Sequence, residues 1–217
     1  MCFSAAANFV GSGVLTAIGV ATLTRVKHKR ELMFASLPTL FAIHQFIEGF
    51  VWLGLDGVLS PKVTHAAGAA FVQGLLPFLI PLSVVLFEPT AARRRKMLPF
   101  VALGLGLTLF MLWGLIAYPL QVYAQHNSIV YTNQATNQTW VAVLYVIAVC
   151  GSLFFSGIDD MVIFGGANLG ILLITMAVKR YAFTSVWCAY AAVASIIICV
   201  YFLRSGKHRP FLYSEAI

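Results

Sequence analysis

Two residues with acid–base side chains stand one helical turn apart inside an apolar stretch of the chain. His44 and Glu48 belong to the segment Leu32–Leu55, and a spacing of four residues places both side chains on one face of a helix. A carboxylate inside a membrane span is costly unless it is protonated or paired. We therefore predict that Glu48 acts as a ligand or general base and His44 as a ligand or proton partner.

Amide and hydroxyl groups from neighbouring stretches reach a similar depth. At about 1.5 Å per helical residue, His44 lies roughly 12 Å and Glu48 roughly 6 Å below the outer boundary of the span. The first apolar stretch carries small polar residues every four positions, and the third presents a glutamine. We predict a polar pocket in the outer half of the membrane, whose ligand-binding residues are Asn8, Ser12, Gln45 and Gln73.

The sharpest hypothesis for this pocket is a metal site. His44, Glu48 and His65 form a set of two histidines and one carboxylate, which matches a catalytic zinc with one open position. A water bound there would be acidified and could attack an ester, amide or carbonyl carbon near the outer leaflet. His65 stands at the mouth of its helix, so His126 and Cys2 are alternative ligands from the same side. This predicts a zinc-dependent membrane hydrolase.

Other classes of function remain open. A protonatable Glu48 beside His44 could serve a proton- or cation-coupled transporter. Asp159 and Asp160 could then supply a second cation site or a gate, although a solvated acidic turn paired with nearby arginine and lysine is the favoured interpretation. A buried His–Glu pair can also be a hydrogen bond that fixes helix register in a non-catalytic receptor or scaffold.

The composition shows which kind of protein must position these groups. The chain has 217 residues, of which 60% are hydrophobic and 10% charged, and its mean hydropathy is +0.89. Soluble domains carry about 25% charged residues, and a disordered chain is far less apolar. Four cysteines without a CxxC spacing give no disulfide framework. We expect an integral membrane protein whose partners are the lipid bilayer and a small molecule or lipid.

Seven apolar stretches approach the length of about 20 residues that a helix needs to cross a bilayer. The fifth and sixth are short, so six or eight spans are alternatives. We predict an all-α fold with one seven-helix transmembrane domain over residues 1–217. The stretches are Ala5–Thr24, Leu32–Leu55, Ala66–Phe87, Met97–Ala117, Trp140–Phe155, Val162–Val178 and Ala182–Leu203.

The positions of lysine and arginine predict the orientation. The net charge of +7 could suggest nucleic acid as a partner, but no segment is polar enough to form a basic face. Most of the 14 basic residues instead occupy three connections that share one side, namely 25–30, 93–96 and the tail 204–217. The positive-inside rule then places the amino terminus outside and the carboxyl terminus in the cytoplasm. We expect the membrane to be the plasma or inner membrane of the cell.

The longest connection, Tyr118–Thr139, would face outside. It contains no lysine, arginine, aspartate or glutamate. Its aromatic residues suit a belt at the membrane interface; they are Tyr118, Tyr123, Tyr131 and, just after it, Trp140.

Two stretches carry a family resemblance. The chain opens with Met1-Cys2-Phe3-Ser4, and the segment from Arg30 to Leu53 contains His44-Gln45 followed by Glu48-Gly49. These features resemble a family of uncharacterised bacterial multi-span membrane proteins, in which a helix carries the pattern HQxxEG. The resemblance implies a membrane fold and no particular activity, and it covers the first quarter of the chain most closely.

Overall fold

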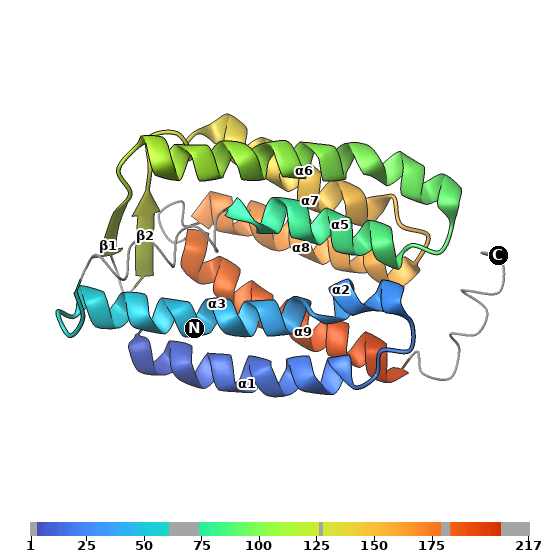
Figure 1. Cartoon of the computed structure of the whole chain (residues 1–217), viewed down its shortest axis with the longest axis horizontal. Helices are drawn as coiled ribbons and strands as arrows, with labels where there is room; N and C mark the ends of the chain where they lie inside the picture. The colour runs from blue at the N-terminus through green and yellow to red at the C-terminus, as the bar shows by residue number, and fades with distance from the viewer. Residues whose placement is uncertain (1–3, 61–73, 126–127, 179–182, 205–217) are drawn as a thin grey trace.

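The computed structural model describes residues 4–60, 74–125, 128–178 and 183–204. These residues are mostly helical (Figure 1). The elements in chain order are α1 (Ala5–Leu23), the short 3₁₀ helix η1 (Lys29–Glu31), α2 (Leu32–Ala35), α3 (Leu37–Leu55), α5 (Leu76–Phe87), α6 (Ala91–Ala117), the strands β1 (Gln121–Gln125) and β2 (Ser128–Thr132), α7 (Thr139–Phe154), α8 (Asp159–Val178) and α9 (Phe183–Arg204).

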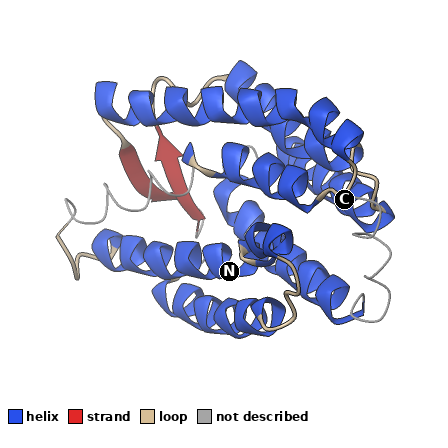
Figure 2. Ribbon diagram, turned by 45° about the vertical axis from the view of Figure 1, so that its right-hand side comes forward, coloured by secondary structure: helices blue, strands red, loops and turns tan. Residues whose placement is uncertain are grey.

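The long helices run along the longest axis of the molecule, so that their connections gather at two ends (Figure 1). The α1–α2, α5–α6 and α7–α8 connections lie at one end, together with the last turn of α9. The two strands and the end of α3 lie at the other end, as Figure 2 also shows. The basic segments 25–30 and 93–96 therefore share one end of the molecule, which we call the basic end. The opposite one is the hairpin end.

Three helical stretches are long and apolar enough to cross a membrane, and they are Ala5–Leu23, Lys29–Leu55 and Ala91–Ala117. Shorter apolar helices cover Leu76–Phe87, Thr139–Phe154 and Ala191–Arg204. Large apolar side chains also face outward, among them Val10 (69% exposed), Ile116 (88%) and Ile163 (69%). Such a surface is unusual for a soluble monomer and is compatible with a membrane protein.

The described helices lie mostly within the seven predicted stretches, and two differences are informative. Helix α6 begins at Ala91 rather than Met97, because the intervening alanine, arginine and lysine residues favour a helix. The second stretch is broken at Ser36 into α2 and α3. Pro38 fits the first turn of the new helix, where its missing N–H removes no helical hydrogen bond.

The prediction of an all-α fold was wrong in the Tyr118–Thr139 connection. Strands β1 and β2 pair antiparallel there, with Gln125 opposite Ser128 and Gln121 opposite Thr132. Alternating β-branched and aromatic residues, such as Val122 and Tyr131, favour strands. Residues 121–125 and 128–132 of this connection therefore pair as two strands.

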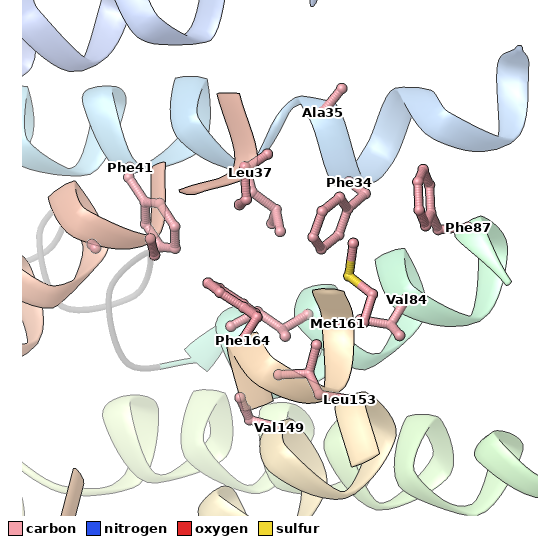
Figure 3. Packing of buried hydrophobic residues seen from close by; sticks show 14 of the residues in the cluster. Phe34, Ala35, Leu37, Phe41, Val84, Phe87, Val149, Leu153, Met161 and Phe164 are labelled. Carbon is pink, nitrogen blue, oxygen red and sulfur yellow. The ribbon is translucent and has the colours of Figure 1, made fainter. Parts of the chain in front are cut away.

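The largest apolar core brings together residues from α2, α3, α5, α7, α8 and α9. Phe34, Phe87 and Phe202 form its aromatic centre, with ring centroids 5.2 to 6.5 Å apart. Figure 3 shows Met161 and Leu153 in the same cluster as Phe34, on two other helices. On α3, His44 and Glu48 lie beyond the residues of this core, toward the hairpin end.

Candidate functional site

His44 and Glu48 lie on one face of α3, as predicted. His44 Nε2 is 3.7 Å from Glu48 Oε1, and the two side chains are 3% and 0% exposed. This distance exceeds that of a normal hydrogen bond. A small group bound between the two side chains could therefore contact both. Two buried groups of complementary acid–base character therefore face the interior together.

Helix α1 packs antiparallel against α3 in a register set by close contacts. The Ser12 hydroxyl donates a hydrogen bond to the carbonyl of Ala42 at 2.9 Å. A Cβ added to Gly49 would lie 2.6 Å from a ring carbon of Phe9, so the Phe9 ring of α1 lies directly against this glycine. This register places Asn8 at the same level along the pair as Glu48.

The contact between α1 and α3 separates two environments. On one side a groove of about 360 Å³ opens at the surface, lined by Phe9, Ser12, Gly13, Thr16, Ala42, Ile43 and Phe46. Helical geometry directs Asn8, Gln45 and Glu48 to the other side, because they lie on the opposite flank of the contact line. The buried residues Asn8, Gln45 and Glu48 therefore form a cluster distinct from the groove, together with His44. We call these four residues the polar cluster.

The amide groups of this cluster are the most unusual feature. Gln45 and Asn8 are both 0% exposed. Neither Oε1 nor Nε2 of Gln45 has a hydrogen-bond partner among the described residues, and the same is true of Asn8 Oδ1; the Asn8 amide nitrogen donates to the Ser4 carbonyl at 3.0 Å. A buried polar atom without a partner costs about 1–3 kcal/mol. The cluster therefore offers both donors and acceptors to a bound group.

Two further polar residues, Trp52 and Tyr131, close the cluster at the hairpin end. Trp52 stands one turn after Glu48 on α3, and Tyr131 comes from β2; both are buried in one apolar cluster with Val51 and Ile129. Trp52 Nε1 and the Tyr131 hydroxyl have no partner among the described residues. Burial, and then the charge of Glu48, raise the pKa of the Tyr131 phenol well above its usual value near 10.

Sequence reasoning missed both residues. It assigned Tyr131 to an interfacial belt, whereas only 9% of this side chain is exposed. The spacing of Trp52 from His44 and Glu48, four residues at each step, was the available signal. For Tyr131 the signal was the strand alternation around it.

The other predicted site residues divide into two groups. Ser12 lies at the α1–α3 contact, where its hydroxyl donates a hydrogen bond to the carbonyl of Ala42. His65, Gln73, His126 and Cys2 lie outside the described residues. Within residues 4–60, 74–125, 128–178 and 183–204, no group of three or more histidine, cysteine, aspartate or glutamate side chains is placed to hold a metal ion. The zinc site thus stays a prediction.

Glu48 is not the only buried carboxylate. Glu31 and Glu88, near the basic end, are also 0% exposed. Glu31 accepts hydrogen bonds from the backbone N–H groups of Lys27 and His28. Glu88 accepts from Ser156 and Gly157. Backbone donors thus stabilise these two as structural groups, whereas Asp159 and Asp160 are exposed in the first turn of α8.

Comparisons with known proteins place the chain in a family without assigning an activity. No curated protein matches the chain, and no solved structure matches it. The model of a family of unknown function, DUF6629, matches residues 1–211. This match extends well beyond the first quarter of the chain, where the sequence resemblance is strongest, and it includes every residue of the polar cluster. The chain therefore belongs to the DUF6629 family of unknown function.

Proposed function

We propose that this protein is an integral membrane protein of seven spans, with its amino terminus outside and its carboxyl terminus in the cytoplasm. The proposal is supported by the gathering of the segments 25–30 and 93–96 at one end of the molecule and by the positive-inside rule. A carboxyl-terminal fusion to green fluorescent protein should then fluoresce, and a fusion to alkaline phosphatase should be inactive. The reverse result would overturn the orientation.

In this orientation the polar cluster lies in the outer half of the membrane, and we propose that it binds a small polar ligand. The observation that carries this proposal is the amide of Gln45, which is fully buried with neither polar atom bonded within the described residues. Ligand sites are usually enclosed and mostly apolar, with a few convergent polar groups. The cluster has this composition.

Acceptor groups predominate in the cluster. Glu48, Asn8 Oδ1 and Gln45 Oε1 can all accept a hydrogen bond, and the imidazole of His44 can accept or donate one. A ligand with a positive charge or a hydrogen-bond donor fits this set best. Glu48 would take the proton or charge of the ligand, and His44, 3.7 Å away, would exchange a proton with Glu48. The same pair could act as base and proton partner in a reaction of the bound molecule.

The test is the reactivity of Glu48 toward dicyclohexylcarbodiimide, an apolar reagent that modifies carboxyl groups in membranes. We expect labelling of Glu48 in the detergent-purified protein, measured by peptide mass spectrometry. Methylammonium, a small cation with hydrogen-bond donors, should slow this labelling, whereas acetate at the same concentration should not.

Internal controls exist in the same chain. Glu31 and Glu88 are equally buried but accept hydrogen bonds from the backbone, so they should not react. Glu48→Gln removes the labelled group itself. A wild-type protein in which Glu48 does not react, or in which methylammonium gives no protection, would overturn the ligand site and leave Glu48 as a structural residue.

A further inference from the structure

The hairpin end of the polar cluster differs in character from the rest. Trp52 and Tyr131 belong to one packed group with Val51 and Ile129, and they are 7% and 9% exposed. An indole N–H can only donate a hydrogen bond, and a phenol hydroxyl donates readily. Neither Trp52 Nε1 nor the Tyr131 hydroxyl has a partner within the described parts of the chain.

Buried tyrosine and tryptophan side chains usually place their polar atom on a partner. Here the two atoms come from different elements, since Trp52 belongs to α3 and Tyr131 to β2. The hairpin stands beside the end of α3 in both views of the molecule (Figures 1 and 2). Folding of the hairpin thus brings a second buried donor to a helix that already carries one.

We propose that Trp52 and Tyr131 form a donor pair that binds a neutral carbonyl oxygen of the ligand. The inference rests on the proposed ligand site and names the chemical class of its occupant: a small uncharged ester, amide or ketone group at this end, with the donor or cationic part of the molecule toward Glu48. The hairpin is then part of the site, and Tyr131 is a specificity-determining residue.

The surroundings select a neutral acceptor over an anion. Glu48 is close enough to act on the Tyr131 phenol, so a carboxylate or phosphate bound here would face another acidic group. The partly buried side chains that pack around the pair are apolar, among them Leu55, Leu120 and Val122. An anion would lose its hydration among these apolar side chains, whereas a carbonyl oxygen needs only the two hydrogen bonds.

The experiment follows the indole N–H resonance of Trp52 by nuclear magnetic resonance in protein labelled with ¹⁵N-tryptophan. The chain has 4 tryptophans, and Trp52→Phe identifies the resonance. N,N-dimethylacetamide is the probe, because it has a carbonyl oxygen and no hydrogen-bond donor. We expect it to shift the Trp52 resonance in a saturable manner, and we expect acetate not to do so.

Tyr131→Phe removes one hydroxyl and should weaken dimethylacetamide binding about tenfold, as expected for one lost hydrogen bond of about 1.4 kcal/mol. Tyr123→Phe is the matched control, because Tyr123 is on the partner strand and 42% exposed; it should bind like wild type. Retained protection of Glu48 by methylammonium in Tyr131→Phe shows that the variant keeps its fold.

Each outcome decides between the alternatives. A Trp52 resonance that does not respond to dimethylacetamide, or that responds equally in wild type and Tyr131→Phe, overturns the donor pair. If Tyr131→Phe loses both the response to dimethylacetamide and the protection by methylammonium, the donor pair is also overturned. The hydroxyl would then be needed for the fold and not for binding the carbonyl. Failure of carbodiimide labelling at Glu48 contradicts the proposed ligand site separately, since the Trp52 resonance is read without it.

Discussion

The carboxylate of Glu88 holds the hydroxyl of Ser156, a residue 68 positions later in the chain, at 3.1 Å. The same oxygen accepts the backbone N–H of Gly157 at 2.8 Å, and Glu88 Oε1 accepts that of Thr90 at 3.3 Å. Glu88 therefore joins the end of α5 to the turn that precedes α8. This buried carboxylate has several donors, and its role is structural.

Replacing Glu88 by alanine should lower the stability of the protein, because Ser156 and the N–H of Gly157 lose their acceptor inside the molecule. We expect a decrease of about 1–3 kcal/mol in the free energy of unfolding, and a smaller decrease for Ser156→Ala, which leaves the Gly157 bond intact. Thermal unfolding in detergent measures both. Asp159→Ala is the control, since Asp159 is exposed; an equal loss in the control would contradict the role of Glu88.

The helices could be predicted because their signal is local. Runs of apolar residues bounded by basic or turn residues gave α1, α7 and α9 to within about two residues. The face shared by His44 and Glu48 follows from the spacing alone. The structure confirms both, because a helix needs only its own backbone hydrogen bonds and an apolar face.

Features that depend on partners distant in the chain could not be predicted in the same way. Glu88 follows an apolar stretch and resembles any solvated helix end, yet it is buried by the α7–α8 turn. Tyr131 resembles an interfacial aromatic residue, yet strand pairing turns it toward Trp52. The local sequence around Glu88 or Tyr131 does not indicate which distant residues pack against them. Their burial could therefore be recognised only from the fold.

Gly104 on α6 should not tolerate a side chain. A Cβ at this position would collide with the carbonyl oxygen of Pro77 on α5 and lie 3.2 Å from the Cα of Phe78. Because these are backbone atoms, the helices must separate, and we expect Gly104→Ala to destabilise the protein by about 1–3 kcal/mol.

The same helix provides the control for this substitution. Gly106 has no atom within 4 Å of the added Cβ, so Gly106→Ala should be neutral or slightly stabilising, since alanine favours a helix. Unfolding temperatures of the two variants, measured side by side, test the packing of α5 on α6. Equal behaviour of the two variants would show that the helices do not approach at Gly104.

Tyr131 should make the protein less stable at alkaline pH. Its pKa is raised in the folded state, first by burial and then by Glu48, above the value near 10 that an unfolded tyrosine has. The stability that this neutral phenol contributes is therefore complete below pH 10 and is lost as the pH rises from 10 toward the folded pKa, because only the unfolded state releases the proton in that range.

The measurement compares the unfolding temperatures of wild type and Tyr131→Phe between pH 8 and pH 11. The decline above about pH 10 should be steeper in wild type than in Tyr131→Phe. Tyr123→Phe should follow wild type, because Tyr123 is 42% exposed. Parallel curves for wild type and Tyr131→Phe would show that the phenol ionises as easily in the folded protein as in the unfolded chain.

The zinc hypothesis can be separated from binding of an organic ligand by the metal content of the purified protein. His44 and Glu48 are both buried and lie 3.7 Å apart, which suits two ligands of one ion, and the third ligand predicted from the sequence, His65, lies outside the described residues. A resident catalytic zinc should appear as about one ion per chain and should be lost in both His44→Ala and Glu48→Gln.

Elemental analysis of protein purified without chelators provides this test, and Asp159→Ala should retain any metal because its side chain is exposed in the first turn of α8. If zinc is lost only in His44→Ala and Glu48→Gln, these two residues bind the ion. Esters and amides of the outer leaflet would then be the first substrates to test. Wild-type protein without zinc would exclude a resident catalytic zinc. Glu48 would then act on its ligand directly, as an acceptor of a proton or of a positive charge.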